Sequence, residues 1–105
     1  MSELDRLADQ HFLESQAHLR HIDDLMAKVK QAQAQRPVAP EHARTLARLE
    51  QEHGRMTRDL KSFRDLPQPA TANTVARGEG IKGVLQTLGL ELEKTLAAVI
   101  GGDTH

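Results

Sequence analysis

The sequence contains no cysteine, no tryptophan and no tyrosine, and it has only two phenylalanines. Without cysteine the chain has no disulfide framework, no thiolate ligand for zinc and no cysteine nucleophile. With so little aromatic surface it is poorly equipped to stack on nucleic-acid bases. Its formal net charge is -1 at pH 7, so we expect no overall electrostatic attraction to nucleic acid. These absences disfavour cysteine chemistry and nucleic-acid binding.

A long hydrophobic run is also missing. The most apolar stretch, residues 84–100, is interrupted by Glu91, Glu93 and Lys94, and these charges are incompatible with a membrane span. The start of the chain is charged and lacks the apolar core of a signal peptide. We therefore expect a cytoplasmic protein that does not cross a membrane. The 105 residues suit a single domain with a modest core.

Three segments have the apolar periodicity of amphipathic helices. The first, residues 3–35, contains neither Gly nor Pro and is preceded by Ser2, a good N-cap residue. The second, about residues 40–65, has apolar side chains at alternating steps of four and three. The third, about residues 80–100, is followed by two glycines that end it. Between the last two, residues 66–79 are rich in Pro, Ala, Thr and Gly, so we predict a linker there.

The short proline-containing turn after the first segment predicts an antiparallel hairpin. Given the rise of a helix, residues whose numbers add to about 75 lie side by side. This register places Ile22 beside His53 and the two phenylalanines, Phe12 and Phe63, beside each other. The third helix then covers the apolar face of the hairpin. We predict an all-α antiparallel three-helix bundle in one domain, residues 1–105, which could also dimerise through a four-helix core.

Charge is distributed unevenly along the chain. Residues 1–25 have a net charge of -4, residues 26–66 of +4, and the remaining segment of -1. Antiparallel packing would place acidic and basic segments side by side, within one chain or between two. Such pairs set register and orientation more than stability.

Six histidines are a high number for this length. Three of them recur with Glu14 at steps of three and four along the first helix. The hairpin register brings a fourth histidine, from the second helix, near these three. Imidazoles together with a carboxylate could hold zinc, nickel or iron. The candidate ligands are His11, His18, His21 and His53. Alternatively, these side chains border the apolar stripe and are half-buried, or they sense pH. We favour the border position and expect no cofactor.

A stripe of arginines lies beside the apolar seam of the second segment. Its members are Arg44, Arg48, Arg55 and Arg58. Arginines in a row could follow phosphates, but Glu41, Glu52 and Asp59 on the same helix weaken that field. We therefore expect a solvated face, or a docking surface for the acidic residues 1–25, in preference to a nucleic-acid interface.

No catalytic constellation is recognisable. Residues 78–83 match the letters of a dinucleotide-binding fingerprint, but no predicted strand precedes them, as that site requires. Asp23 and Asp24 are adjacent in sequence and so diverge around a helix. The serines lie at a cap or in helix interiors, away from any strained turn. We therefore expect a protein that is not an enzyme.

These observations favour a small interaction module, with an adaptor, chaperone-like or regulatory role, that packs helices against another protein or against itself. The leucines of the third helix spread over more than one face, so some could form a docking surface. Its candidate residues are Leu85, Leu88, Leu90, Leu92 and Leu96, together with the arginine stripe. The alternative is that the third helix is buried between the other two. The alternative function is a metal-binding or metal-sensing protein that uses the four histidines.

Overall fold

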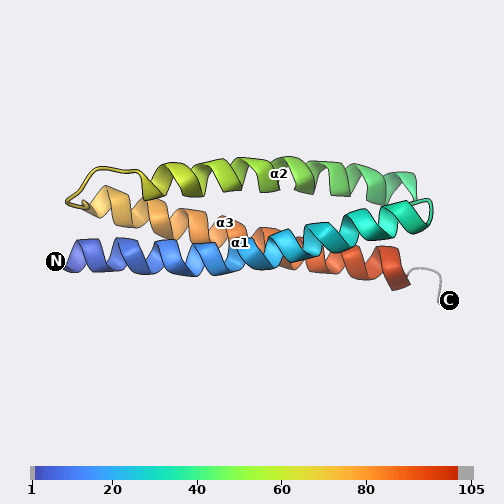
Figure 1. Cartoon of the computed structure of the whole chain (residues 1–105), viewed down its shortest axis with the longest axis horizontal. Helices are drawn as coiled ribbons and strands as arrows, with labels where there is room; N and C mark the ends of the chain where they lie inside the picture. The colour runs from blue at the N-terminus through green and yellow to red at the C-terminus, as the bar shows by residue number, and fades with distance from the viewer. Residues whose placement is uncertain (1, 102–105) are drawn as a thin grey trace.

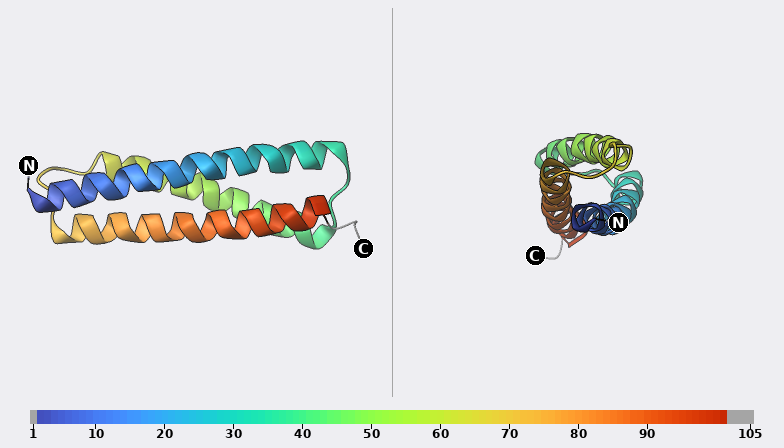
Figure 2. Two further views of the ribbon diagram at one scale, coloured as in Figure 1. Left: turned by 90° about the horizontal axis from the view of Figure 1, so that it is seen from below. Right: turned by 90° about the vertical axis from the view of Figure 1, so that its left-hand side faces the viewer.

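The chain forms three long helices that run up, down and up along one axis (Figure 1). The computed structural model describes residues 2–101, in which the helices are α1 (Glu3–Gln35), α2 (Pro40–Arg64) and α3 (Ala72–Gly101), with no strand. The bundle measures 54 × 20 × 18 Å. α2 is antiparallel to the other two, and α1 and α3 are parallel neighbours (Figure 2). The prediction of an all-α three-helix bundle is confirmed.

The ends of α1 and α2 follow from local chemistry. The backbone N–H of Asp5 donates to the Ser2 hydroxyl over 3.1 Å, which satisfies one of the free amides at the start of α1. α1 ends at Gln35, before the extended Arg36 and the proline that follows it. α2 begins with Pro40, where a missing amide hydrogen leaves no helical bond unmade.

The start of α3 corrects the predicted linker. The helix begins at Ala72 and not near Gly80, so the connection from α2 is much shorter than residues 66–79. Thr71 precedes the helix, and its Oγ1 accepts a hydrogen bond from the backbone N–H of Thr74. The Thr74 hydroxyl accepts from the Thr71 N–H in return, which is a reciprocal cap. Within the first turns, position 78 is a glycine because Phe63 occupies the place that a side chain would take.

The core runs the length of the bundle and is entirely aliphatic apart from two methionines and one phenylalanine. Its buried hydrophobic residues are Ile22, Leu25, Met26, Val29, Leu46, Leu49, Met56, Leu60, Phe63, Ile81, Leu85, Leu88, Leu92 and Leu96. Full burial of one such side chain stabilises the fold by about 1.5–3 kcal/mol. α3 contributes five of them, so the third helix completes the core that the hairpin leaves open.

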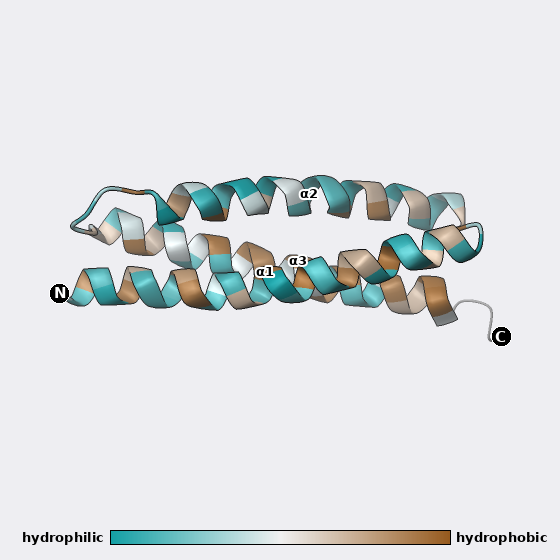
Figure 3. Cartoon of the chain, in the orientation of Figure 1, coloured by the Kyte–Doolittle hydropathy of each residue, from teal (hydrophilic) through white to brown (hydrophobic). Residues whose placement is uncertain are grey.

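Polar contacts between helices fix their register. His53 Nε2 donates a hydrogen bond to Asp23 Oδ1 over 2.6 Å. Asp23 follows Ile22, so this contact agrees with the predicted register to within one residue. Arg48 of α2 forms an ion pair with Glu91 of α3. Hydropathy differs between the helices: the residues of α2 are mostly hydrophilic, whereas many of those of α3 are apolar (Figure 3). Within residues 2–101, no helix is both long enough and apolar enough to span a membrane.

Candidate functional site

The four candidate histidine ligands lie apart. His53 bonds to Asp23 across the contact between α1 and α2. His21 lies on another flank of α1, where its Nε2 is 2.6 Å from Glu93 Oε1 of α3. His11 is half-buried, and its Nδ1 has no hydrogen-bond partner among the described residues. His18 is half-buried as well.

Helical geometry explains why these side chains do not converge. His11 and His18 are seven residues apart, which is a rise of about 10 Å along α1. His21 of α1 pairs with a carboxylate on α3. His53 of α2 pairs with a carboxylate on α1. In the described part of the chain, no three His, Cys, Asp or Glu side chains are placed to hold one metal ion. The predicted set of four ligands is therefore not assembled.

The candidate leucines divide into two groups. Four of them are buried in the core, namely Leu85, Leu88, Leu92 and Leu96. For these four leucines the structure agrees with the alternative of a buried third helix, because the hairpin and α3 cover one another along this side. Leu90 lies on the opposite side of the helix and is 68% exposed. Only this leucine of the predicted set is available to a partner.

A groove of about 490 Å³ lies beside Leu90, between α1 and α3. From α1 it is lined by His18 and His21, and from α3 by Gly83, Gln86, Leu90 and Glu93. The floor includes Gly89, where a Cβ atom would be in ordinary contact with Ile22 at 3.7 Å. The groove is therefore apolar at its base and has the His21–Glu93 pair along it. It brings together residues from both predicted sets, leucines and histidines.

We call the solvent-facing side of α3 next to this groove the α3 outer face. Its exposed members are Ala76, Glu79, Gly80, Gly83, Gln86, Thr87, Leu90, Lys94 and Ala97. Apart from the adjoining backbone of α3 and the neighbouring residues in the chain, a Cβ atom added at Gly80 or at Gly83 would meet no heavy atom within 4 Å in the part of the chain that the structure describes. The sequence indicates glycines in this helix, but only the structure shows that these two face solvent.

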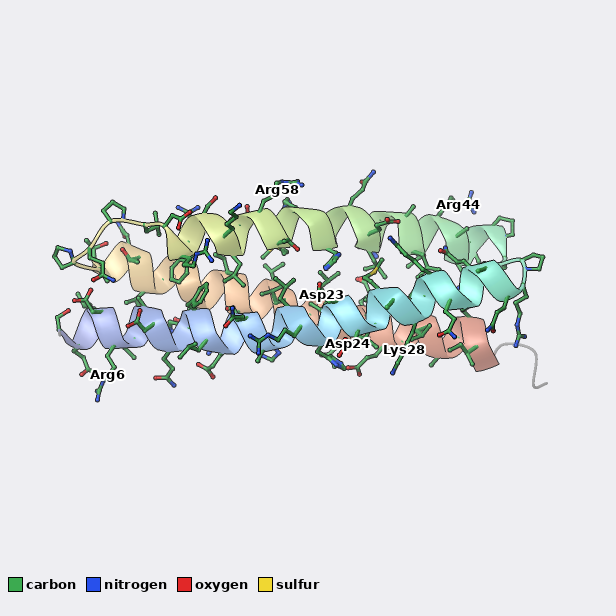
Figure 4. The ribbon with its side chains drawn as sticks, in the orientation of Figure 1. Arg6, Asp23, Asp24, Lys28, Arg44 and Arg58 are labelled. Carbon is green, nitrogen blue, oxygen red and sulfur yellow. The ribbon has the colours of Figure 1, made fainter. Side chains whose placement is uncertain are left out.

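The arginine stripe lies on the side of α2 that is turned away from α1. Arg44 and Arg58 point outward (Figure 4), and both, like Arg55, are exposed and form no ion pair within residues 2–101. Arg48 differs, because it bonds to Glu91 of α3, and this hydrogen bond raises the Arg48 pKa above its ordinary value. Within the described part of this chain, these arginines therefore form no ion pair with the acidic residues 1–25. Three of them form the solvated face that was the other expectation.

Comparisons of this chain with protein-family models, with curated protein sequences and with solved structures give no match. Inferences about function therefore depend on the surface described above.

Proposed function

We propose that this chain is a small helical protein–protein interaction module that binds a partner helix on the α3 outer face. The observation that carries the proposal is Leu90, which is 68% exposed beside a groove of about 490 Å³. A single exposed leucine is common on protein surfaces. Here Leu90 can make an apolar contact with the partner, and the groove beside it can accommodate the partner's side chains. This is the arrangement of helix-in-groove recognition.

Glycine next to Leu90 supports the same surface. Two helices approach most closely where side chains at their contact are small. Gly83 is exposed and lines the groove, and Gly80 lies one turn before it on the same side. A partner helix could therefore contact the backbone of α3 there, with Leu90 as its main apolar contact. Polar groups along the groove, above all His21 and Glu93, would set the orientation of that partner.

Site-specific photo-crosslinking in the native cells tests this proposal. A photoreactive amino acid replaces Leu90 in one variant and Leu13 of α1 in a matched variant, because Leu13 is also largely exposed, at 62%. We expect a discrete crosslinked complex from position 90 and none from position 13. The same crosslinks from both positions, or none from either, would contradict a docking surface on α3.

A substitution gives the corresponding affinity test. Leu90→Asp removes the apolar anchor and should reduce capture of the crosslinked partner by about 30-fold or more, as loss of a central interface residue does. Leu13→Asp should leave capture unchanged. Circular dichroism of both variants controls for folding, since both side chains project into solvent.

A further inference from the structure

One side of α2 carries several positive charges and no acid, and we call it the α2 outer face. Its exposed members are Ala43, Arg44, Ala47, Gln51, Arg55, Arg58, Lys61 and Ser62. At 3.6 residues per turn these positions cover about one third of the helix surface, on the side turned away from the core. Four of them are cations, and Arg44 and Arg58 point outward from the bundle (Figure 4).

Folding does not account for this group of charges. None of the four cations forms an ion pair within residues 2–101. By contrast, Arg48 of the same helix is bonded to Glu91 of α3. Arg55, Arg58 and Lys61 also follow one another at steps of three, so like charges are neighbours on the helix surface, which is unfavourable. A negatively charged partner outside this chain would relieve that repulsion.

Three of the four cations are arginines, which indicates the kind of group that they bind. A guanidinium has a planar set of donors that matches two oxygens of a carboxylate or of a phosphate, whereas the ammonium of lysine acts as a point charge. Arg44 and Arg58 are two steps of seven apart, with Gln51 midway, so they form a line of about 21 Å along α2. The face therefore fits an elongated partner with anionic groups at similar intervals.

Acids border the α2 outer face along both edges and limit its width. Glu50 is on the edge next to α1, where its Oε1 is 4.0 Å from Nζ of Lys30. Glu52 is on the edge next to α3, 3.9 Å from Arg48, and Asp59 lies on the same side. A DNA duplex or a bilayer is wider than one helix, so it would meet these acids as well as the arginines, which is unfavourable. A helix with one row of carboxylates would meet the arginines alone.

A shallow groove gives such a helix room to approach. It has a volume of about 740 Å³ and is lined by Ala47, Glu50, Gln51, Gly54, Arg55 and Arg58. A Cβ atom at Gly54 would be 3.6 Å from Nη1 of Arg58, so this guanidinium lies beside the glycine, within the groove. Because the residues beneath it are small, a partner helix can lie close enough to α2 for its carboxylates to reach the guanidiniums.

A second copy of this chain does not supply that row of carboxylates. The nearest match within residues 2–101 is on α3, where Glu79, Gln86 and Glu93 also recur at steps of seven. Glu93 is already held by His21 of α1, at 2.6 Å. The contact with His21 also shows that this row is on the α1 side of α3. Docking of α2 on it would join two different surfaces, which leads to open chains or rings of molecules and not to a two-fold dimer.

We propose that the α2 outer face binds a helix of another protein that carries a row of carboxylates. These carboxylates pair with Arg44 at one end of the face and with Arg55 and Arg58 nearer the other end. Uncharged residues of the same helix lie over Ala47 and Gly54. This site goes beyond the function proposed above, because it is on a different helix from the α3 outer face and takes a partner of different chemistry. The chain then connects two partners.

A helical peptide tests the spacing of the charges. The probe is an alanine-based, fluorescently labelled peptide with glutamates at alternating steps of four and three along one side and lysines on the opposite side. A second peptide has the same composition, with its glutamates spread around the helix. By fluorescence anisotropy at low salt, the first peptide should bind at least about tenfold more tightly, because only its carboxylates reach the arginines together. Equal binding of the two peptides would overturn the proposal.

Charge reversal tests which arginines bind. Arg44→Glu and Arg58→Glu should each weaken binding of the first peptide by about tenfold or more. Arg20→Glu of α1 is the matched control, because Arg20 is also exposed and the change in net charge is the same. It should leave the dissociation constant nearly unchanged, and circular dichroism checks that all three variants remain folded. Similar weakening in all three would mean that only net charge matters and would overturn the site.

The same measurements distinguish other classes of partner. A short DNA duplex, or vesicles that contain phosphatidylserine, should bind more weakly than the first peptide at the same salt concentration, because the bordering acids repel them. Tighter binding of either would overturn the proposal. Sedimentation equilibrium of the purified chain reports self-association. Self-association that Arg58→Glu removes would identify a second copy as the occupant of this face and would also overturn it.

Photo-crosslinking in the native cells tests the natural partner. A photoreactive amino acid replaces Gln51 on the α2 outer face, and the exposed Gln31 of α1 in a matched variant. We expect a protein adduct from position 51 alone, with the crosslink in a segment that has acids at steps of three, four or seven. An adduct with nucleic acid, or no adduct specific to position 51, would overturn the proposal. Crosslinking from position 90 reports on the α3 outer face, so the proposed function stands or fails separately.

Discussion

Two glycines in the same helix lie in opposite environments. Gly78 is on the inner side of α3, where a Cβ would be 2.7 Å from Cζ of Phe63 and 3.1 Å from Cβ of His11. Gly83, five residues later, is exposed, and within residues 2–101 only the adjoining backbone of α3 and its neighbours in the chain lie within 4 Å of the place of its side chain. Packing inside the chain explains the first glycine and not the second. An unfavourable residue on a free surface is therefore informative, because folding alone does not account for it.

Substitution of a leucine on the inner side of α3 and of one on its outer face should give the largest difference in the free energy of unfolding. Leu92 is fully buried and Leu90 is 68% exposed. Leu92→Asp places an unpaired charge in the core, and should lower the free energy of unfolding by about 4 kcal/mol or more. Leu90→Asp should change it by only about 0.5 kcal/mol, as surface substitutions do. Urea unfolding followed by circular dichroism, at low protein concentration, measures both. Similar losses in the two variants would mean that Leu90 belongs to the core.

Alanine at the two glycines should give effects of opposite sign. Gly83→Ala should raise the free energy of unfolding of the dilute chain by about 1 kcal/mol, the difference in helix propensity. Gly78→Ala gains the same propensity but overfills the contact with Phe63 and His11, which typically destabilises by about 1–3 kcal/mol. We expect a net loss there. Chemical unfolding of the pair measures the difference, and stabilisation by both alanines would show that Phe63 moves aside readily.

Much of the fold could be predicted from sequence because it depends on local signals. Apolar spacing over residues 3–35 and 40–65, with prolines between them, indicates the hairpin and its register. The start of α3 could not be predicted in the same way. Glycine at position 78 predicts a linker. The ring of Phe63, from another helix, explains why a helical position holds a glycine here.

The candidate site was only partly predictable for a similar reason. Residue spacing places three of the histidines along α1, and the hairpin register brings His53 of α2 near them. It does not show that His21 pairs with Glu93. It also does not show that His53 pairs with Asp23. For the leucines a signal was present. Leu90 is two residues from both Leu88 and Leu92, and such a step places it on the opposite side of a helix from them. Helical periodicity is therefore enough to predict that Leu90 lies away from the core leucines. The groove beside Leu90 could not be predicted in this way, because it depends on how α1 and α3 pack together.

The smallest expected effect concerns the segment that leads into α3. The backbone N–H of Ala70 donates to Asp5 Oδ1 of α1 over 2.7 Å. This hydrogen bond, with a further one from the Ser2 hydroxyl, lowers the pKa of Asp5 below its ordinary value of 3.8. A carboxylate with a lowered pKa in the folded state contributes its stabilisation above the ordinary value and loses it as pH falls through the lowered one. The contact should therefore open only in acid.

Nuclear magnetic resonance can follow this opening at one amide. The Ala70 amide proton shift should titrate with a midpoint below 3.8, the ordinary value for Asp5. Asp5→Asn should remove that titration, while amides on the α3 outer face, such as Leu90, should not report it in either chain because they lie far along the bundle. A midpoint at or above the ordinary value would mean that Ala70 does not hold Asp5 in solution. The segment before α3 would then have no hydrogen bond to α1 through Asp5. Only the contacts of Phe63 and the core leucines would then hold the inner side of α3 in place.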